Sequence, residues 1–397
     1  MSIITTTDDL AAFCARLESA PFITVDTEFM RESTYYPKLC LVQVAGPDEA
    51  KAIDPLAPGI SLDPLLALLR GPVMKVFHAA RQDLEIFHKL LGGEMPKPLF
   101  DTQIAAMVCG FGDQASYETL VNKLAGAQVD KSSRFTDWSK RPLTERQVAY
   151  ALADVTHLRT VYRKLSQRIE KSGRAAWIAE DMAALGDPAA YAAKPEDAWL
   201  RLRPRTANPK FLAVLREIAA WREVEAQNRD IPRNRMIRDE ALLEIASDPP
   251  STVEQLLRVR SMSRGIAEGS GGQALLAAVA RAKALPPDQM PQVKHEAALP
   301  RGIGPLVELL KVLLKMQCDR HDVAQKLVAS SSDLDQIAAN DQADVPASQG
   351  WRREVFGNAA LDLKHGRLAL GAEGYKIKLI RMDAVPDAAV EAVAEAK

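Results

Sequence analysis

The first part of the chain alternates short runs of β-branched and aromatic residues with longer runs of helical periodicity. Runs of the first kind predict strands, because branched side chains pack well on a pleated surface. The predicted strands cover 22–29, 39–45 and 73–77. The predicted helices cover 62–69, 79–91, 102–108 and about 144–171. Strands and helices in this mixed order predict an α/β domain, with helices flanking a sheet.

The hydrophobic pattern changes after Gly173, where the strand signal ends. A stretch rich in Ala, Pro and charge, 187–204, predicts a linker. Asn208 followed by Pro209 predicts a helix start, because asparagine caps a helix N-terminus and proline fits its first turn. Further helices are predicted at 239–246, 252–257 and 273–283. A stretch with three prolines, 285–293, predicts a second linker.

A second set of helices follows and weakly repeats the first, since 333–338 (DLDQIA) resembles 241–246 (ALLEIA). We interpret the two sets as copies of one helical module, the second more divergent. The expected organisation is an α/β domain over 1–172, a helical connector and linker over 173–207, a first helical module over 208–285 and a second over 294–382.

Composition places the chain among ordinary globular proteins, with 47% hydrophobic and 26% charged residues. The opening residues lack the basic start and apolar run of a secretory signal. Even the apolar run 306–316 is broken by Glu308, Lys311 and Lys315, so we expect no membrane span. The four cysteines lie far apart without a C-x-x-C pair, which favours free thiols in a reducing cytoplasm over disulfides or zinc.

The formal net charge of −1 conceals an uneven distribution. Residues 1–200 have a small acidic excess, whereas 201–285 carry 15 basic against 10 acidic residues. An arginine-rich segment between two mildly acidic ones hints at contact with a polyanion.

Two carboxylates lie within the first predicted strand. Asp26 and Glu28 are two residues apart, so both side chains emerge on the same face of the strand. Two acids on an otherwise apolar strand are costly unless a cation or a proton neutralises them. Taken alone, the pair is more simply explained by a strand whose polar face meets solvent.

Two further motifs change that balance. Asp83 lies in the first turn of the helix that follows the third strand, a position that also suits an acid through the helix dipole. Tyr150 and Asp154 are four residues apart, which brings them to one face of a helix, about 5–6 Å apart at Cβ. The ordinary alternative for this pair is an amphipathic helix with a polar stripe.

Together these motifs resemble those of the DEDD superfamily of 3′→5′ exonucleases, in its tyrosine subclass. The three motifs are VDTEF (25–29), HAARQDLEIF (78–87) and YALADV (150–155). The intervening YYPKLCLVQV (35–44) and DWSKRPLT (137–144) resemble the ribonuclease D family in particular. The resemblance covers about 1–170 and implies a ribonuclease H-like mixed sheet flanked by helices.

The helical segments resemble HRDC domains, the all-α module found in helicases and at the C-terminus of ribonuclease D. In the first module the matching residues are AWRE (220–223), DIPR (230–233) and DEAL (239–242). The second module fits more loosely, although WRREVFG (351–357) is similar to the end of ribonuclease D.

The resemblance implies two-metal catalysis. The metal ligands it implies are Asp26, Glu28, Asp83 and Asp154, with Tyr150 as the tyrosine of the third motif. Carboxylate oxygens suit Mg²⁺ or Mn²⁺, and two such ions ~4 Å apart can clamp a scissile phosphate. The cofactors expected are therefore two divalent cations, Mg²⁺ or Mn²⁺.

The resemblance also implies the substrate: RNA 3′ ends, as in tRNA precursors, cut to nucleoside 5′-monophosphates by a monomeric enzyme. Residues expected to contact RNA are Thr27 and His78 beside the acids, and Arg233 and Arg235 in the arginine-rich module. Packing of His78 at a strand end and solvation of the arginines are equally simple explanations. The alternative functions are a 3′→5′ DNA exonuclease and a non-catalytic RNA-binding scaffold, which a metal-dependent activity assay on RNA and DNA would distinguish.

Overall fold

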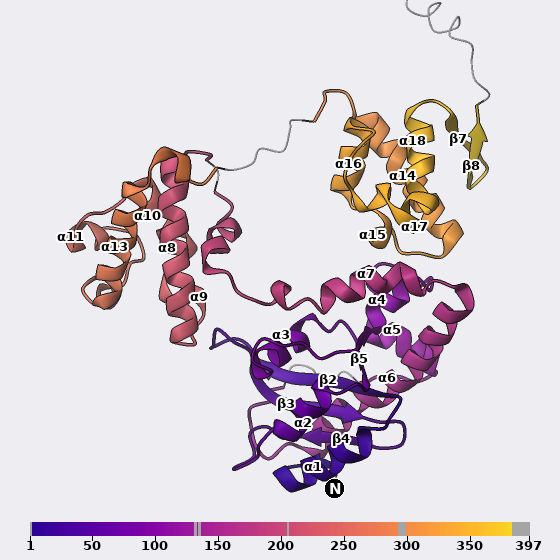
Figure 1. Ribbon diagram of the computed structural model, residues 1–397, viewed down its shortest axis with the longest axis horizontal. Coiled ribbons are helices and arrows are strands. Elements are labelled where there is room, and N and C mark those ends of the chain that lie inside the picture. The colour runs from indigo at the N-terminus through magenta and orange to yellow at the C-terminus, as the bar shows by residue number, and fades with distance from the viewer. Residues whose placement is uncertain (1, 131–132, 134–135, 205, 293–298, 383–397) are drawn as a thin grey trace, which may run out of the picture.

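The computed structural model describes residues 2–130, 133, 136–204, 206–292 and 299–382. It consists of an α/β body, at the bottom of Figure 1, and two helical modules at its upper left and upper right. The first five residues of the expected second module, 294–298, lie outside the described part of the chain.

The α/β body is built on a mixed sheet whose six described strands follow the order β1-β4-β3-β2-β5-β6. The strands are β1 (Ile3–Ile4), β2 (Phe22–Met30), β3 (Lys38–Ala45), β4 (Ala50–Ile53), β5 (Met74–Phe77) and β6 (Leu99–Asp101). β3 is antiparallel to β2 and β4, whereas β5 is parallel to β2 and β6. The expected mixed sheet is thus confirmed. Strands β1, β4 and β6 were not predicted, because two to four residues are too few to show a period.

Helices cover both faces of this sheet (Figure 1). They are α1 (Thr7–Leu17), α2 (Asp63–Arg70), α3 (Arg81–Leu90), α4 (Thr102–Met107), α5 (Tyr117–Leu120), the π-helix η1 (Val121–Ala125) and α6 (Glu145–Ser172). α1, α2 and α3 share one apolar core with the sheet, and α4, α5 and α6 belong to another. The start of α6 has the expected capping box, because Thr144 Oγ1 accepts from Gln147 N while Gln147 Oε1 accepts from Thr144 N.

The first helical module has its own apolar core. Its helices are α8 (Pro209–Asn228), α9 (Arg233–Met236), α10 (Asp239–Ser247), α11 (Val253–Leu256), α12 (Arg264–Ala267) and α13 (Ser270–Ala284). Asn208 caps α8 as expected, its Oδ1 accepting from Lys210 N at 3.0 Å. The 3₁₀ helix η3 (Pro195–Leu202) packs on α8 and buries Trp199 in the same core, so this end of the expected linker is part of the module.

The second helical module shares a core with the α/β body. Its elements are α14 (Gly304–His321), α15 (Gln325–Val328), α16 (Ser331–Ala339), α17 (Gly350–Arg352), the π-helix η6 (Arg353–Gly357), α18 (Asn358–Lys364), β7 (Leu368–Glu373) and β8 (Lys376–Arg381). One continuous buried cluster contains Leu158 of α6 together with Leu310 of α14 and Phe356. The hairpin β7–β8 departs from the expected all-α module; alternation of polar and apolar residues covers only 376–379 of β8, too few positions to give a clear strand signal.

Helix α7 (Ala175–Leu185) forms part of this junction. Trp177 stacks on Trp351 with ring centroids 4.3 Å apart. Arg352, which is buried, forms ion pairs of 2.9 Å with Glu180 and Asp181. The helix expected as a connector therefore binds the second module to the α/β body. Across the described residues, no helix is long and apolar enough to cross a membrane.

This shared core predicts how a truncated chain behaves. Ending the chain near 195 removes α14 and Phe356 and exposes apolar side chains of α4, α6 and α7 that they cover. We expect the melting temperature of fragment 1–195 to fall by roughly 10 °C or more, since one kcal/mol corresponds to about 2–4 °C in a protein of this size. Differential scanning calorimetry of the fragment and the full chain measures the change, and equal melting temperatures would contradict a shared core.

Candidate active site

Strand β2 carries the first two acids at a place where one of its edges is unpaired. Asp26 and Glu28 lie opposite Gln43 and Leu41 of β3. On the other edge, β2 pairs with β5 only as far as Thr24. The two carboxylates therefore emerge beyond the end of β5, where the chain turns into α3.

A cap residue shapes the turn between β5 and α3. Asp101 accepts hydrogen bonds from Ala79 N at 3.2 Å and Ala80 N at 2.8 Å, and it also caps α4 through Gln103 N at 2.7 Å. Ala79 has φ of 56°, a left-handed conformation that these bonds help to hold. The turn delivers Asp83, which is buried, to the side of β2.

The hydroxyl of Thr27 donates a hydrogen bond to Asp83 Oδ1. Thr27 was expected to contact RNA. It is buried, and its hydrogen bond holds the carboxylate of Asp83 in place. The alternation of side chains along a strand could have indicated this, because residue 27 lies on the opposite face of β2 from Asp26 and Glu28.

Helix α6 supplies the third motif. The hydroxyl of Thr24 donates to the carbonyl of Val155 at 2.8 Å, which ties the helix to β2. The fully buried Ala151 allows close approach of the helix to its neighbours. Carboxylate oxygens of Asp26, Glu28 and Asp154 all lie within 4.8 Å of one another. The structure thus brings three of the four expected ligands together. The fourth, Asp83, lies beside β2, where it accepts a hydrogen bond from Thr27.

The crowding raises the pKa of these acids. Burial raises the pKa of Asp26 to about 6. Burial, followed by the negative charges of Asp26, Asp154 and Asp83, raises the pKa of Glu28 to about 9. Burial and the charge of Asp26 raise the pKa of Asp83 well above its usual range. Such a group of oxygen ligands fits hard divalent cations, whose charge would replace the protons.

A cavity of about 340 Å³ opens onto the acids. Asp26, Tyr150, Asp154, His78 and Tyr117 line it, so the expected Tyr150 and His78 are at the site. Tyr117 was not predicted, because a single tyrosine after the cap of a four-residue helix gives no sequence signal. Its hydroxyl donates to Ala153 O at 2.8 Å, and burial, then the charge of Asp154, raises its pKa.

Hydrogen bonding determines the tautomer of His78. The hydroxyl of Thr102 donates to Phe77 O at 3.0 Å, so toward His78 Nδ1, also at 3.0 Å, it acts as an acceptor. Nδ1 therefore carries the proton and Nε2 is an acceptor. Burial lowers the pKa of His78, which keeps the ring neutral at pH 7.

The two expected arginines lie away from this cavity, in the first module. Arg233 forms an ion pair of 2.6 Å with the buried Glu223 and donates to Tyr35 Oη at 2.8 Å. It therefore joins the module to the loop that follows β2. Arg235 is exposed on α9.

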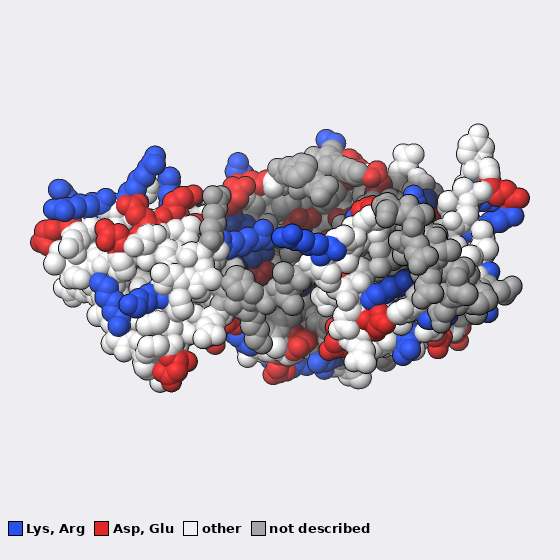
Figure 2. Space-filling model, turned by 90° about the horizontal axis from the view of Figure 1, so that it is seen from above, with Lys and Arg blue, Asp and Glu red and all other residues white. Residues whose placement is uncertain are grey.

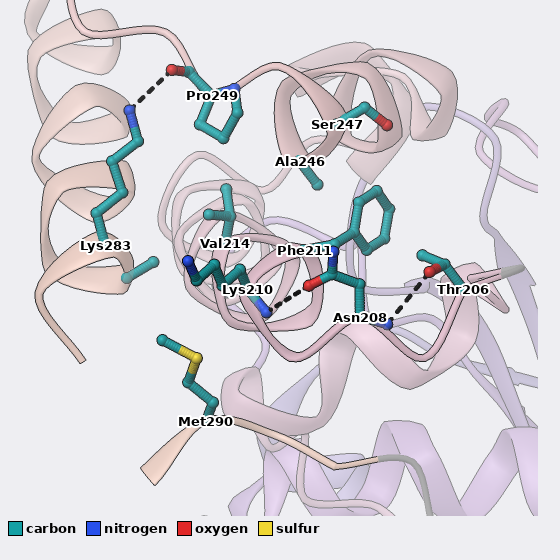
Figure 3. Close-up of a pocket in the computed structure, with 11 residues that line it drawn as sticks. Thr206, Asn208, Lys210, Phe211, Val214, Ala246, Ser247, Pro249, Lys283 and Met290 are labelled. Carbon is teal, nitrogen blue, oxygen red and sulfur yellow. Dashed lines mark hydrogen bonds between the residues drawn. The ribbon is translucent and has the colours of Figure 1, made fainter. Parts of the chain in front are cut away.

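The first module contains a separate cavity of about 540 Å³, drawn in Figure 3. Its polar groups bind one another: Lys283 donates to Pro249 O at 2.9 Å, and Asn208 bridges Thr206 and Lys210 (Figure 3). Among the described residues that line it there is no acid, which distinguishes it from the cavity at β2.

The fold and the acidic site define a metal-dependent 3′→5′ exonuclease. A family model described as 3′-5′ exonuclease matches residues 1–170, and a model of the HRDC domain matches 211–279. Among full-length relatives, ribonuclease D of Gluconacetobacter diazotrophicus is 56% identical over 379 residues, covering 95% of this chain and 96% of the relative. Ribonuclease D of Granulibacter bethesdensis is 54% identical over 381 residues, covering 96% of each chain.

The chain belongs to the ribonuclease D family and is a 3′→5′ exoribonuclease. A solved structure agrees. The crystal structure of Escherichia coli RNase D, described as an exoribonuclease involved in structured RNA processing, is similar with a TM-score of 0.77 and 34% identity. The similarity covers 92% of this chain and 98% of that one, so it includes both helical modules.

Proposed function

We propose that this enzyme shortens RNA from its 3′ end, releasing nucleoside 5′-monophosphates, at a site where Asp26, Glu28, Asp83 and Asp154 hold two divalent cations. The observation that carries this proposal is the approach of three carboxylates to within 4.8 Å, with the buried Asp83 beside them. A binding scaffold has no reason to bear this electrostatic cost.

Each side chain of the site has a defined task. The cations, when bound, would polarise the scissile phosphate and lower the pKa of water. Asp26, Glu28 and Asp154, whose carboxylate oxygens lie within 4.8 Å of one another, would hold the ions together with Asp83. Tyr150, on the same cavity wall, orients the attacking water, while the ring of Tyr117 forms a wall for the terminal nucleotide.

We further propose that the substrates are tRNA precursors and other structured RNAs with single-stranded 3′ ends. The related Escherichia coli enzyme is described as acting in structured RNA processing, which supports this substrate class. The described cysteines are free, which suits a reducing cytoplasm. We propose Mg²⁺ or Mn²⁺ as the ions and a monomer as the working form.

The test of this proposal is a product ladder. Purified enzyme is incubated with 5′-labelled single-stranded RNA or DNA of one sequence, with Mg²⁺, Mn²⁺ or a chelator. We expect RNA to shorten one nucleotide at a time only with a divalent ion, and 5′-monophosphates to appear. Faster degradation of DNA would favour the DNA exonuclease, and no degradation would favour a binding scaffold.

His78 is proposed to distinguish ribose from deoxyribose. Its Nε2 is an acceptor at the wall of the cavity, where it can accept a hydrogen bond from a ribose hydroxyl. We expect His78→Phe to lower kcat/KM for RNA roughly tenfold, the effect of about 1.4 kcal/mol, and to affect an RNA with a 2′-deoxy terminal residue less. Competition between the all-RNA substrate and the 2′-deoxy-terminated substrate gives the ratio of their kcat/KM values. If this ratio is the same in His78→Phe as in the wild type, His78 does not distinguish the two sugars.

A further inference from the structure

A basic cavity of about 520 Å³ lies where the α/β body, the connector and the first module meet. One wall is the outer face of α3, a second is the loop after β2, and a third comes from η3 and the first module. The cations that line it are Arg31, Arg81, Lys89, Arg201 and Arg233. Side chains from three separate parts of the chain thus bring positive charge to one hollow.

Three of these cations have acidic partners. Arg31 pairs with Glu85 at 2.8 Å, and both side chains are partly exposed. Arg201 and Arg233 share Glu223, at 2.8 and 2.6 Å. Because Glu223 is only 1% exposed and bound by two guanidinium groups, one of its two partners retains an uncompensated positive charge.

The remaining two cations lie on α3. Lys89 Nζ lies 3.2 Å from the centroid of the Tyr36 ring, and the negative charge of Asp230 also acts on this ammonium group. Arg81 is exposed, and among the described residues it has neither a hydrogen bond nor an ion pair from its side chain. The two residues are eight positions apart on one helix, about two turns, so they project along the same side.

Three of these cations also line a second hollow. A neighbouring cavity of about 340 Å³ shares Arg31, Tyr35, Arg201 and Arg233 with it. Figure 2, seen from the side of the two helical modules, shows basic side chains in the recessed middle of that face as well. Arg31, Arg201 and Arg233 therefore line both cavities, and the further arginine of the neighbouring cavity, Arg222, pairs with Asp239 at 2.6 Å.

The cavity borders the two elements that carry the acids. Arg31 follows Glu28 by three residues at the end of β2, and Arg81 precedes Asp83 by two residues at the start of α3. Asp83 and Arg81 lie on opposite faces of the helix, since two positions turn it by about 200°. An RNA strand that leaves the acidic site around the start of α3 would run toward the cavity.

We propose that this cavity binds backbone phosphates of the RNA strand that trails the 3′-terminal nucleotide, with Arg81 and Lys89 as phosphate ligands. The proposal rests on the proposed function, because it requires an RNA whose 3′ end lies at Asp26. Cations from the loop after β2, from α3 and from the first module can bind a charged backbone without reading its sequence. Tyr35 and Tyr36 also line the cavity, where Arg233 lies over the ring of Tyr35 and Lys89 over the ring of Tyr36.

The test measures binding of a fluorescent single-stranded RNA of 12 nucleotides by anisotropy, at several KCl concentrations. All proteins carry Asp26→Asn so that the RNA stays intact. We expect Arg81→Ala with Lys89→Ala to weaken binding roughly tenfold and to flatten the log–log salt slope by about 1.4, since each phosphate contact on a single strand contributes about 0.7. Arg81→Glu should weaken it further, because it adds repulsion.

The matched control is Arg258→Ala, an exposed arginine of the first module outside the cavity. It should change neither the affinity nor the slope. A melting temperature equal to that of the parent excludes unfolding as the cause, and Arg81→Ala alone provides a second variant that breaks no described contact. Equal affinities and equal slopes for parent and cavity variants would overturn the proposal, whereas a wild-type enzyme inert toward RNA would instead overturn the proposed function.

Discussion

The variant Asp26→Asn should lose nearly all exonuclease activity while still binding RNA. Asp26 lies with Glu28 and Asp154 in one group of carboxylates, and the amide keeps its shape but removes the charge that a hard cation requires. We expect kcat on single-stranded RNA to fall on the order of 10⁴-fold, the scale typical for loss of a central catalytic group. Initial rates with saturating Mn²⁺ measure the loss.

The control for this variant is Asp63→Asn, an exposed acid at the start of α2 in the same body. It should keep the wild-type rate. If Asp26→Asn degrades RNA at a rate close to wild type, the assignment of the metal site is wrong, whatever the other acids do.

The second large effect concerns the stability of the metal-free protein. Folding raises the pKa of Glu28 from an ordinary 4.5 to about 9, so the folded protein binds more protons than the unfolded chain between these values. Its contribution to stability is therefore complete below about pH 4.5 and is lost progressively as the pH rises toward 9. Asp26, with a pKa of about 6, adds the same trend over a narrower range.

Divalent cations should reverse this loss. They bind the folded site and stabilise it by mass action, by roughly 2.7 kcal/mol at a concentration of 100 times Kd. Thermal unfolding in EDTA and in Mn²⁺, at pH 6 and pH 8.5, is the measurement. We expect the increase in melting temperature on adding Mn²⁺ to be larger at pH 8.5.

Asp83→Asn provides the matched variant for this experiment. The amide oxygen can still accept the hydrogen bond from Thr27, but the negative charge of Asp83, which adds to burial and to the charges of Asp26 and Asp154 in raising the pKa of Glu28, is gone. The metal-free variant should melt at a higher temperature than the wild type and respond less to Mn²⁺. A wild-type protein whose melting temperature is the same with and without the ion at both pH values would count against clustered carboxylates.

The acids could be predicted from the sequence because their motifs resemble those of the DEDD exonucleases and local geometry agrees with that resemblance. The period of a strand brings Asp26 and Glu28 to one face, and the turn of a helix aligns Tyr150 with Asp154. The motif around Asp83 identified the third position. These residues needed no knowledge of distant contacts.

The walls of the site could not be predicted in the same way. Tyr117 reaches the cavity through packing against α6, and its hydroxyl binds Ala153 O, a contact 36 positions along the chain. The role of Thr27 became visible only when α3 was placed beside β2. Long-range packing has no local period, so sequence reasoning does not detect it.

The arrangement of the modules depends equally on distant contacts. Arg233 looked like a free cation in an arginine-rich segment, but its guanidinium binds Glu223 and Tyr35. The charge count was correct, but it could not show that Glu223 pairs with this arginine, or that Tyr35, in a loop nearly 200 residues earlier, accepts a hydrogen bond from it. The same limit applies to Trp351, whose stacking on Trp177 joins the second module to the α/β body.

The most direct test of the central claim is the number of Mn²⁺ ions that one chain binds. Isothermal titration calorimetry of metal-free enzyme at pH 8, with a short RNA carrying a non-hydrolysable 3′-terminal linkage, counts them. Four carboxylates around one phosphate predict two ions per chain in the wild type, and the loss of at least one in Asp26→Asn. Binding of no ion by the wild type, or an unchanged number in Asp26→Asn, would contradict the account.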